Sequence, residues 1–170
     1  AAIFASSSFA ADGAHKLAAG GTGRSGGPPK GHSVLDLMGS LMFWEYVTFG
    51  IVICHEGWRY PETVRAAARR GAQVVFHPHY HWAEADSYRP TTFADPANTF
   101  HEKAALCRAA ENTIWFATVN YASEGSGTTS AVAAPDGTLL VYQPYGEAGV
   151  LVADLDLSLA TGLLASRCRS

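Results

Sequence analysis

The sequence predicts an α/β fold with a mixed β-sheet. Three observations carry this prediction. A strand, a helix and a second strand follow one another between residues 47 and 77, which is typical of a βαβ unit with parallel strands. A second helix signal is followed by four strand signals. A tight turn joins two of those strands as a hairpin, so parallel and antiparallel neighbours share one sheet.

The predicted βαβ unit starts with residues 47–54, VTFGIVIC, an apolar run rich in β-branched side chains. Such a run predicts a strand buried on both faces. Pro61 opens the helix at a position where its missing N–H costs nothing, and Gly71 caps the helix. Residues 73–77 form the second strand.

The rest of the chain alternates loop, helix and strand signals. Residues 78–95 are polar and aromatic with two prolines, which predicts a loop, and residues 97–111 predict a helix. The turn Pro135-Asp136-Gly137 joins the hairpin. The remaining segments are strands at 113–120, 130–134, 138–142 and 149–154, and a last short helix at 156–165.

Composition excludes several classes of protein. The chain has 170 residues, which suits one domain, and its 48% apolar and 16% charged residues suit a globular core. A net charge of -3 argues against a nucleic-acid partner. No run approaches the ~20 apolar residues of a membrane-spanning helix, so no membrane partner is expected.

Cysteine usage and the amino-terminal sequence predict location and domain limits. Three cysteines without CxxC spacing suit a reducing compartment, and residues 1–16 lack the pattern of a signal peptide, so we expect a cytoplasmic protein. Residues 1–44 are an alanine-, glycine- and serine-rich segment, which predicts a flexible or rearranged stretch. The folded domain is predicted over residues 45–170.

Cys54 is the first candidate for chemistry, because it ends the predicted strand just before the turn into the next helix. Ligands of open α/β sheets sit beyond the carboxyl ends of the strands. A thiol there is open to solvent, and backbone N–H groups of the turn can hold an oxyanion. The alternative is a buried structural cysteine.

The segment ICHEGWRYPETVRAAARRGAQVVFHP resembles the nucleophile segment of the carbon–nitrogen hydrolase (nitrilase) superfamily. That segment reads Ile-Cys-x-Asp-x-x-Phe-Pro-Glu, then Arg, then Gly-Ala. Glu56 stands for the usual aspartate and Tyr60 for the usual phenylalanine. Residues 108–120, 130–140 and 150–157 resemble later segments of the family. The matching residues of the first segment are Ile53, Cys54, Pro61, Glu62, Arg65, Gly71 and Ala72.

The resemblance implies the carboxyl-terminal portion of an α-β-β-α sandwich and a cysteine hydrolase. Members cleave small amide, nitrile or carbamoyl substrates through a thioester, with a glutamate as general base and a lysine at the tetrahedral intermediate. It implies Cys54 as nucleophile and the backbone N–H of His55 as oxyanion donor. It also implies homo-oligomers and no cofactor.

Two parts of the family pattern are missing or weak. Lys30, in PPKGHSVL, faintly resembles the family's lysine segment, but an exposed linker lysine is the alternative. No glutamate precedes Lys30. Glu56 is a conceivable substitute base, whereas Glu62 suits the helix dipole. The alternative function is therefore a catalytically inactive fragment that serves as a structural or interaction module.

Histidines alternate at His77, His79 and His81, which places all three on one side of an extended segment. A metal site is one interpretation of this pattern, and a solvated loop is another. The resemblance instead implies that the segment borders the substrate pocket.

The substrate-binding residues expected on this basis are Trp58, His79 and Tyr80. Cys107 is expected in the core of its helix, and Cys168 on the surface. Half of a sandwich leaves a sheet face uncovered, so we also expect the isolated chain to be marginally stable or to self-associate through that face.

Overall fold

The computed structural model describes residues 2–6, 47–84 and 86–167. Lys30, Cys168 and most of the predicted segment 1–44 lie outside the described residues. No helix within the described ranges has the length and apolar character needed to cross a membrane.

Five strands form one mixed sheet in the order β2-β3-β4-β5-β6. The pairs β2–β3 and β3–β4 are parallel, and the pairs β4–β5 and β5–β6 are antiparallel. The predicted α/β class, βαβ unit and hairpin are therefore confirmed. The strands are β2 (Phe49–Ile51), β3 (Val74–His79), β4 (Trp115–Asn120), β5 (Ala131–Ala133) and β6 (Leu139–Tyr142).

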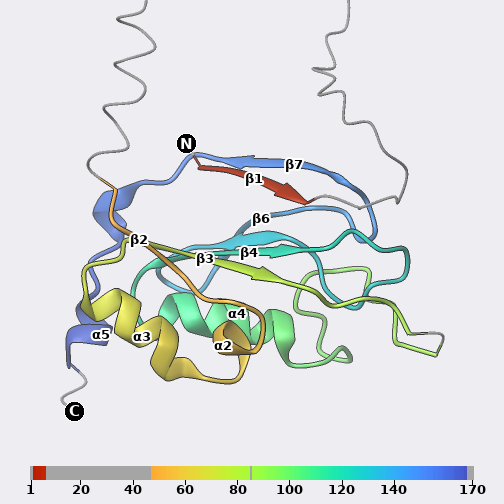
Figure 1. The fold of residues 1–170 in the computed structure, drawn as a ribbon, viewed down its shortest axis with the longest axis horizontal. Coiled ribbons are helices and arrows are strands. Elements are labelled where there is room, and N and C mark those ends of the chain that lie inside the picture. The colour runs from red at the N-terminus through yellow and green to blue at the C-terminus, as the bar shows by residue number, and fades with distance from the viewer. Residues whose placement is uncertain (1, 7–46, 85, 168–170) are drawn as a thin grey trace, which may run out of the picture. The chain divides into compact units, whose positions relative to one another are not determined.

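The sheet lies between two other layers (Figure 1). Helices cover one face, and the strand β7 (Gly149–Ala153), paired antiparallel with β1 (Ala2–Ser6), lies over the other. This is the α-β-β part of the expected sandwich. The helices are α2 (His55–Trp58), α3 (Pro61–Arg69), α4 (His101–Ala110), the 3-10 turn η2 (Leu157–Leu159) and α5 (Leu163–Arg167).

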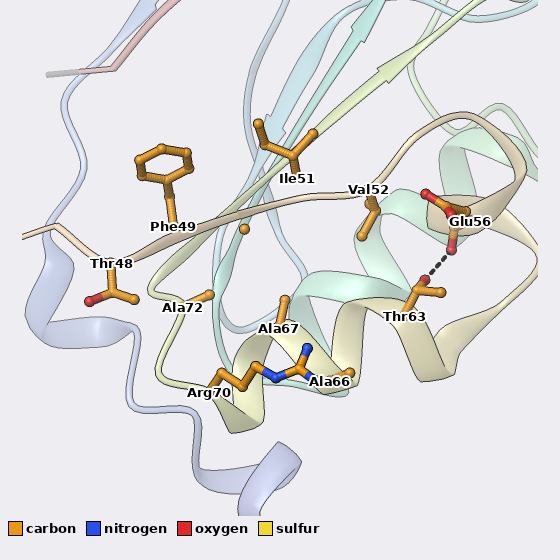
Figure 2. Close-up of a pocket in the computed structure, with 11 residues that line it drawn as sticks. Thr48, Phe49, Ile51, Val52, Glu56, Thr63, Ala66, Ala67, Arg70 and Ala72 are labelled. Atoms are coloured by element: carbon orange, nitrogen blue, oxygen red, sulfur yellow. Dashed lines mark hydrogen bonds between the residues drawn. The ribbon is translucent and has the colours of Figure 1, made fainter.

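The strand β2 is shorter and more exposed than predicted. The prediction of a strand buried on both faces is wrong, because Phe49 is 51% and Ile51 61% exposed. Within the described residues β2 pairs with β3 alone, so its other edge is open. Figure 2 shows Phe49 and Ile51 pointing away from α3, with Val52 on the helix side. A groove of ≈ 420 Å³ runs between β2 and α3.

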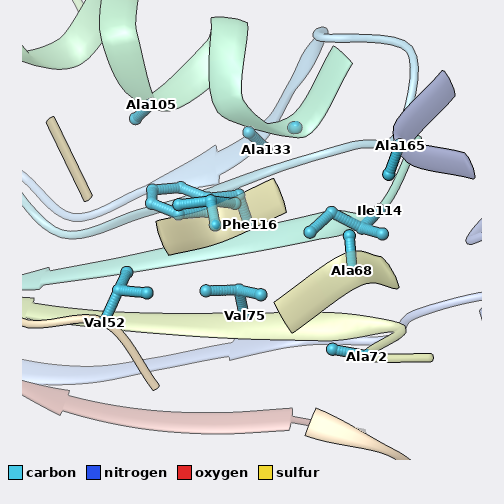
Figure 3. Packing of buried hydrophobic residues seen from close by; sticks show 11 residues of the cluster. Val52, Ala68, Ala72, Val75, Ala105, Ile114, Phe116, Ala133 and Ala165 are labelled. Carbon is cyan, nitrogen blue, oxygen red and sulfur yellow. The ribbon is translucent and has the colours of Figure 1, made fainter. Parts of the chain in front are cut away.

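Two apolar clusters hold the layers together, one on each face of the sheet. Because side chains alternate along a strand, Val75 of β3 joins the helix-side cluster and Val74 the opposite one. Figure 3 shows the helix-side cluster, with Phe116 and Ile114 at its centre. On the other face, Leu151 of β7 packs in the cluster with Val74.

The helix predicted at 97–111 begins only at His101, and Cys107 is exposed, which corrects its predicted place in the core. Before His101, side chains form hydrogen bonds with backbone groups that a helix would otherwise use. The Asn98 side chain accepts the N–H of Thr99, and the Lys103 ammonium donates to the carbonyls of residues 96, 98 and 99. The short helix α2 was not predicted.

Candidate active site at Cys54

Cys54 lies where β2 ends and α2 begins. Its backbone has φ 51° and ψ -117°, a conformation that favours glycine. Strain of this kind costs of order 1–3 kcal/mol and persists only where the surroundings impose it. The thiol-bearing residue is half-buried, as a reactive cysteine requires. The structure thus places the predicted nucleophile on a sharp strand-to-helix elbow.

Hydrogen bonds hold both sides of this elbow. The N–H of Cys54 donates to the carbonyl of Pro78 at 2.9 Å, and the N–H of Gly57 donates to the carbonyl of Cys54 at 3.1 Å. The Glu56 carboxylate accepts the N–H of Ile53 at 2.8 Å. The Thr63 hydroxyl donates to the Glu56 carbonyl at 2.6 Å. Glu56, the conceivable substitute base, therefore has a carboxylate oxygen engaged by the backbone of the elbow.

His77 reaches the elbow from the neighbouring strand β3. Its Nε2 lies 2.7 Å from the Cys54 carbonyl oxygen, and its Nδ1 lies 3.2 Å from the Thr118 hydroxyl. The side chain is fully buried. Burial, together with the charge of Arg108, lowers the pKa of His77 to about 4. The imidazole is therefore neutral at pH 7.

Arg108 of α4 holds the two carbonyls at the end of α2. Its guanidinium donates to Gly57 at 3.1 Å and to Trp58 at 2.8 Å, and it pairs with Glu111 at 2.8 Å. Asn112 donates to the Arg108 carbonyl at 2.9 Å. These contacts give Glu111 and Asn112 a structural role beside Arg108.

Trp58 is 4% exposed and lies inside a group of histidines. Its ring centroid is 4.3 Å from that of His79 and 4.4 Å from that of His101. Four of the histidines beside it, His77, His79, His81 and His101, are here called the histidine cluster. The exposed His55 also lies beside Trp58, at 6.2 Å between ring centroids. Burial lowers the pKa of each member of the cluster, that of His101 to about 4. His101 escaped the sequence analysis, because only the packing of α4 brings it to Trp58.

The alternating histidines do lie on one side of their segment, as predicted. His79 faces Trp58, whereas Tyr80 points to the opposite side and is 57% exposed. Tyr80 packs beside Tyr121 at 5.4 Å and beside Trp82 at 6.2 Å between ring centroids. His79 and Tyr80 therefore do not line one common surface.

Several ring nitrogens of the cluster have protein partners, whereas Nδ1 of His79 is buried without a hydrogen-bond partner among the described residues. His77 uses both nitrogens, and Nδ1 of His81 lies 3.1 Å from the Thr128 hydroxyl. Across residues 2–6, 47–84 and 86–167, no group of three or more His, Cys, Asp or Glu is arranged to hold a metal ion.

Buried polar residues that the sequence did not single out anchor the loops beyond β3 and β4. Glu102 accepts the N–H groups of Ala94 and Thr129 and the Tyr145 hydroxyl. Burial raises the pKa of Glu102. Asn120 accepts the N–H of His81 and donates back to its carbonyl. No local motif marks these residues, because their partners are distant in the sequence.

The groove between β2 and α3 is separate from the predicted substrate-binding residues. Its polar side chains come from Thr48, Glu56, Thr63 and Arg70. Neither Cys54 nor His79 lines it. Lys103, the one lysine among the described residues, donates to backbone carbonyls at the start of α4.

The resemblance to the nitrilase superfamily implies an α-β-β-α sandwich, and the α-β-β arrangement described above agrees with it. A family profile described as carbon–nitrogen hydrolase matches residues 22–163. The chain belongs to the carbon–nitrogen hydrolase family.

Individual relatives agree with this assignment. A curated nitrilase from Pyrococcus abyssi is 28% identical over 118 residues, which are 67% of this chain and 39% of that protein. The NitN amidase from Nesterenkonia sp. AN1 is 29% identical with a TM-score of 0.51, covering 71% of this chain and 42% of that one. A nitrilase-superfamily member from Saccharomyces cerevisiae, at 20% identity and a TM-score of 0.50, covers 69% of this chain and 41% of that one and shares the fold. The chain spans about two fifths of the length of these relatives.

Proposed function

We propose that Cys54 is the nucleophile of a hydrolase that cleaves a non-peptide carbon–nitrogen bond of a small amide, nitrile or carbamoyl compound. The observation that carries the proposal is the strained elbow at Cys54, in a chain of the carbon–nitrogen hydrolase family. An amidase among the structural relatives supports an amide as the substrate to test first.

With an amide, the thiolate Sγ attacks the carbonyl carbon, and the carbonyl electron pair moves to oxygen. The carbon–nitrogen bond then breaks, and nitrogen leaves with a proton as ammonia or an amine. A thioester remains on Cys54. Water attacks its carbonyl carbon, the sulfur–carbon bond breaks, and the acid leaves with the thiol restored.

The oxyanion of the tetrahedral intermediate needs donors close to Cys54. The N–H of His55 is the first of α2, where no i→i-4 carbonyl of the helix is available to it. We assign it as one donor, and Lys30 as the cation that the family uses. No residue of this chain is assigned as general base, because no glutamate precedes Lys30 and Glu56 is bonded to Ile53.

Substrate binding is proposed at Trp58, His79 and Tyr80. Tyr80 is the accessible member of this set, with Trp82 and Tyr121 beside it. Trp58 and His79 lie on the opposite side of this segment from Tyr80, so we propose that they act by holding the segment in place and do not line one surface with Tyr80. A Tyr80→Ala change should raise KM more than it lowers kcat.

The test is the alkylation rate of each cysteine against pH, measured by peptide mass mapping. The thiolate is the reacting form, so the midpoint reports the working pKa. Fast alkylation of Cys54 relative to the exposed Cys107 would support an activated nucleophile, and an amide and nitrile panel with Cys54→Ala as control then measures turnover. Equal rates for Cys54 and Cys107 would contradict the proposal.

The second candidate function is a catalytically inactive structural or interaction module. Among the described residues β2 pairs with β3 alone, and this open edge, where another strand could pair, favours it. It predicts an unreactive Cys54 and no turnover on the whole panel.

A further inference from the structure

His77 is the buried polar side chain closest to the proposed nucleophile that the mechanism leaves without a role. It lies outside the family motif residues matched in the sequence. Its contact with the Cys54 carbonyl, at 2.7 Å, joins β3 to the elbow across the parallel pair β2–β3.

The two contacts of His77 determine its tautomer. A carbonyl oxygen only accepts, so Nε2 must carry the hydrogen that is donated to Cys54. A neutral imidazole has one N–H, so Nδ1 is an acceptor and the Thr118 hydroxyl donates to it. The low pKa of His77 agrees with a neutral ring. The Cys54 carbonyl thereby selects the Nε2–H tautomer, and the Thr118 hydroxyl from β4, which can donate or accept, satisfies Nδ1.

Packing leaves the ring one orientation. A Cβ placed on Gly57 would lie 2.3 Å from the ring, so this position of α2 has no room for a side chain while His77 stays in place. Trp58 and Phe116 border the ring at 5.1 and 5.3 Å between centroids. The other titratable or charged groups facing it are Arg108 of α4, His101 of α4 and His79 of its own strand.

Fixing the Cys54 carbonyl also fixes the next N–H. The peptide unit between Cys54 and His55 is planar and trans, so its N–H points opposite to its C=O. Since the carbonyl points to His77 and to the N–H of Gly57, the N–H of His55 points away from them. This is the group assigned above as oxyanion donor.

We propose that His77 is a positioning residue: its Nε2–H, on a ring whose Nδ1 is bonded to the Thr118 hydroxyl, holds the Cys54 carbonyl and thereby orients both the thiol elbow and the His55 N–H. The proposal rests on the proposed role of Cys54 as nucleophile. His77 acts through the backbone and does not touch the substrate.

The first measurement is the tautomer of His77 in the full chain, from ¹⁵N NMR of the imidazole at pH 7. We expect a protonated Nε2 and an unprotonated Nδ1. Thr118→Val should shift the Nδ1 resonance, because it removes the hydrogen bond to that nitrogen. A wild-type His77 with its hydrogen on Nδ1 would overturn the proposal.

The second measurement is the alkylation of Cys54 by iodoacetamide across pH in His77→Gln and His77→Leu. Glutamine retains an N–H donor at similar reach, and leucine has none. His77→Leu loses one hydrogen bond to the elbow, so the alkylation rate of Cys54 should fall about tenfold. In His77→Gln the rate should be within about twofold of the wild-type rate. Cys107 should react equally in all three proteins, because it lies outside the elbow. An alkylation rate of Cys54 that is as low in His77→Gln as in His77→Leu would contradict the proposal. A rate in His77→Leu as high as in the wild-type chain would contradict it too.

If His77→Leu does not fold, Thr118→Val is the deciding variant, because it retains the imidazole and removes only the hydroxyl bonded to Nδ1. A Cys54 rate unchanged by Thr118→Val would then count against the proposal. The proposed function can be refuted independently of this contact. If Cys54 of the wild-type chain is unreactive while His77 is protonated on Nε2, the role of Cys54 as nucleophile is refuted and the His77 contact is not.

Discussion

Lowering the pH from 7 to 4 should destabilise the chain through the histidine cluster. His77 has a pKa of about 4 in the folded chain, against 6.5 for a free histidine. The unfolded chain therefore binds this proton between pH 6.5 and 4 and the folded chain does not, so stability present above pH 6.5 is lost as the pH falls toward 4. At about 1.4 kcal/mol per pH unit, this single side chain removes roughly 3 kcal/mol.

Neighbouring titratable groups increase or decrease this loss of stability, each in a direction set by its own pKa shift. His79 and His81 have lowered pKa values and add to the loss. His101 adds less than its own shift suggests, because it is about half exposed to solvent, which screens its charge. Glu102 has a raised pKa, so its protonated form is favoured in the folded chain and it opposes the loss. A loss of about 3 kcal/mol is a large share of the 5–15 kcal/mol typical of a domain.

The assay is urea unfolding followed by tryptophan fluorescence at pH 7, 6, 5 and 4. His77→Gln cannot titrate at this position, so its free energy of unfolding should fall by about 3 kcal/mol less than that of the parent chain over this range. Equal slopes for the two proteins would refute the assignment of a buried, neutral His77.

Three further predictions concern the elbow and the open strand edge. Gly57→Ala places a Cβ 2.3 Å from the His77 ring, so it should lower the free energy of unfolding in urea by more than about 2 kcal/mol. Gly71→Ala is the control, because Gly71 has φ +93° and nothing within 4 Å of a Cβ, and it should lose about 1 kcal/mol for backbone strain alone. Arg108→Lys cannot hold two carbonyls and Glu111 together and should cost about 2 kcal/mol, with thermal unfolding as the measurement; an unchanged Tm would contradict the bridging role. We expect the chain to self-associate in gel filtration and Ile51→Lys to shift it toward monomer, since a charge blocks pairing at an open apolar edge; a monomeric parent chain would exclude this.

The sequence predicted the strand and helix order well because the local signals were strong. Pro61 begins α3 as expected. The turn at Pro135 to Gly137 forms with Asp136 accepting the N–H of Thr138, and Gly137 adopting φ 86°. These features depend on residues within a few positions of each other, which sequence patterns capture.

The contacts around Cys54 were beyond sequence analysis, because they join residues that are distant along the chain. Arg108 reaches Gly57 across 51 positions, and His77 meets Thr118 across 41. The exposure of β2 was missed for a different reason. An apolar run looks the same whether a strand is covered on both faces or on one, and only the neighbouring strands and layers decide which.

The backbone of Cys54 has a consequence for which amino acids suit this position. A glycine adopts φ 51° and ψ -117° without steric penalty, so by the criterion of folding alone glycine is the better residue there. Cys54→Gly should therefore give a chain that is more stable than Cys54→Ala, although neither carries a thiol. Under the proposed role of Cys54, folding and chemistry therefore favour different side chains at position 54, and a stabilising substitution there would remove the proposed nucleophile.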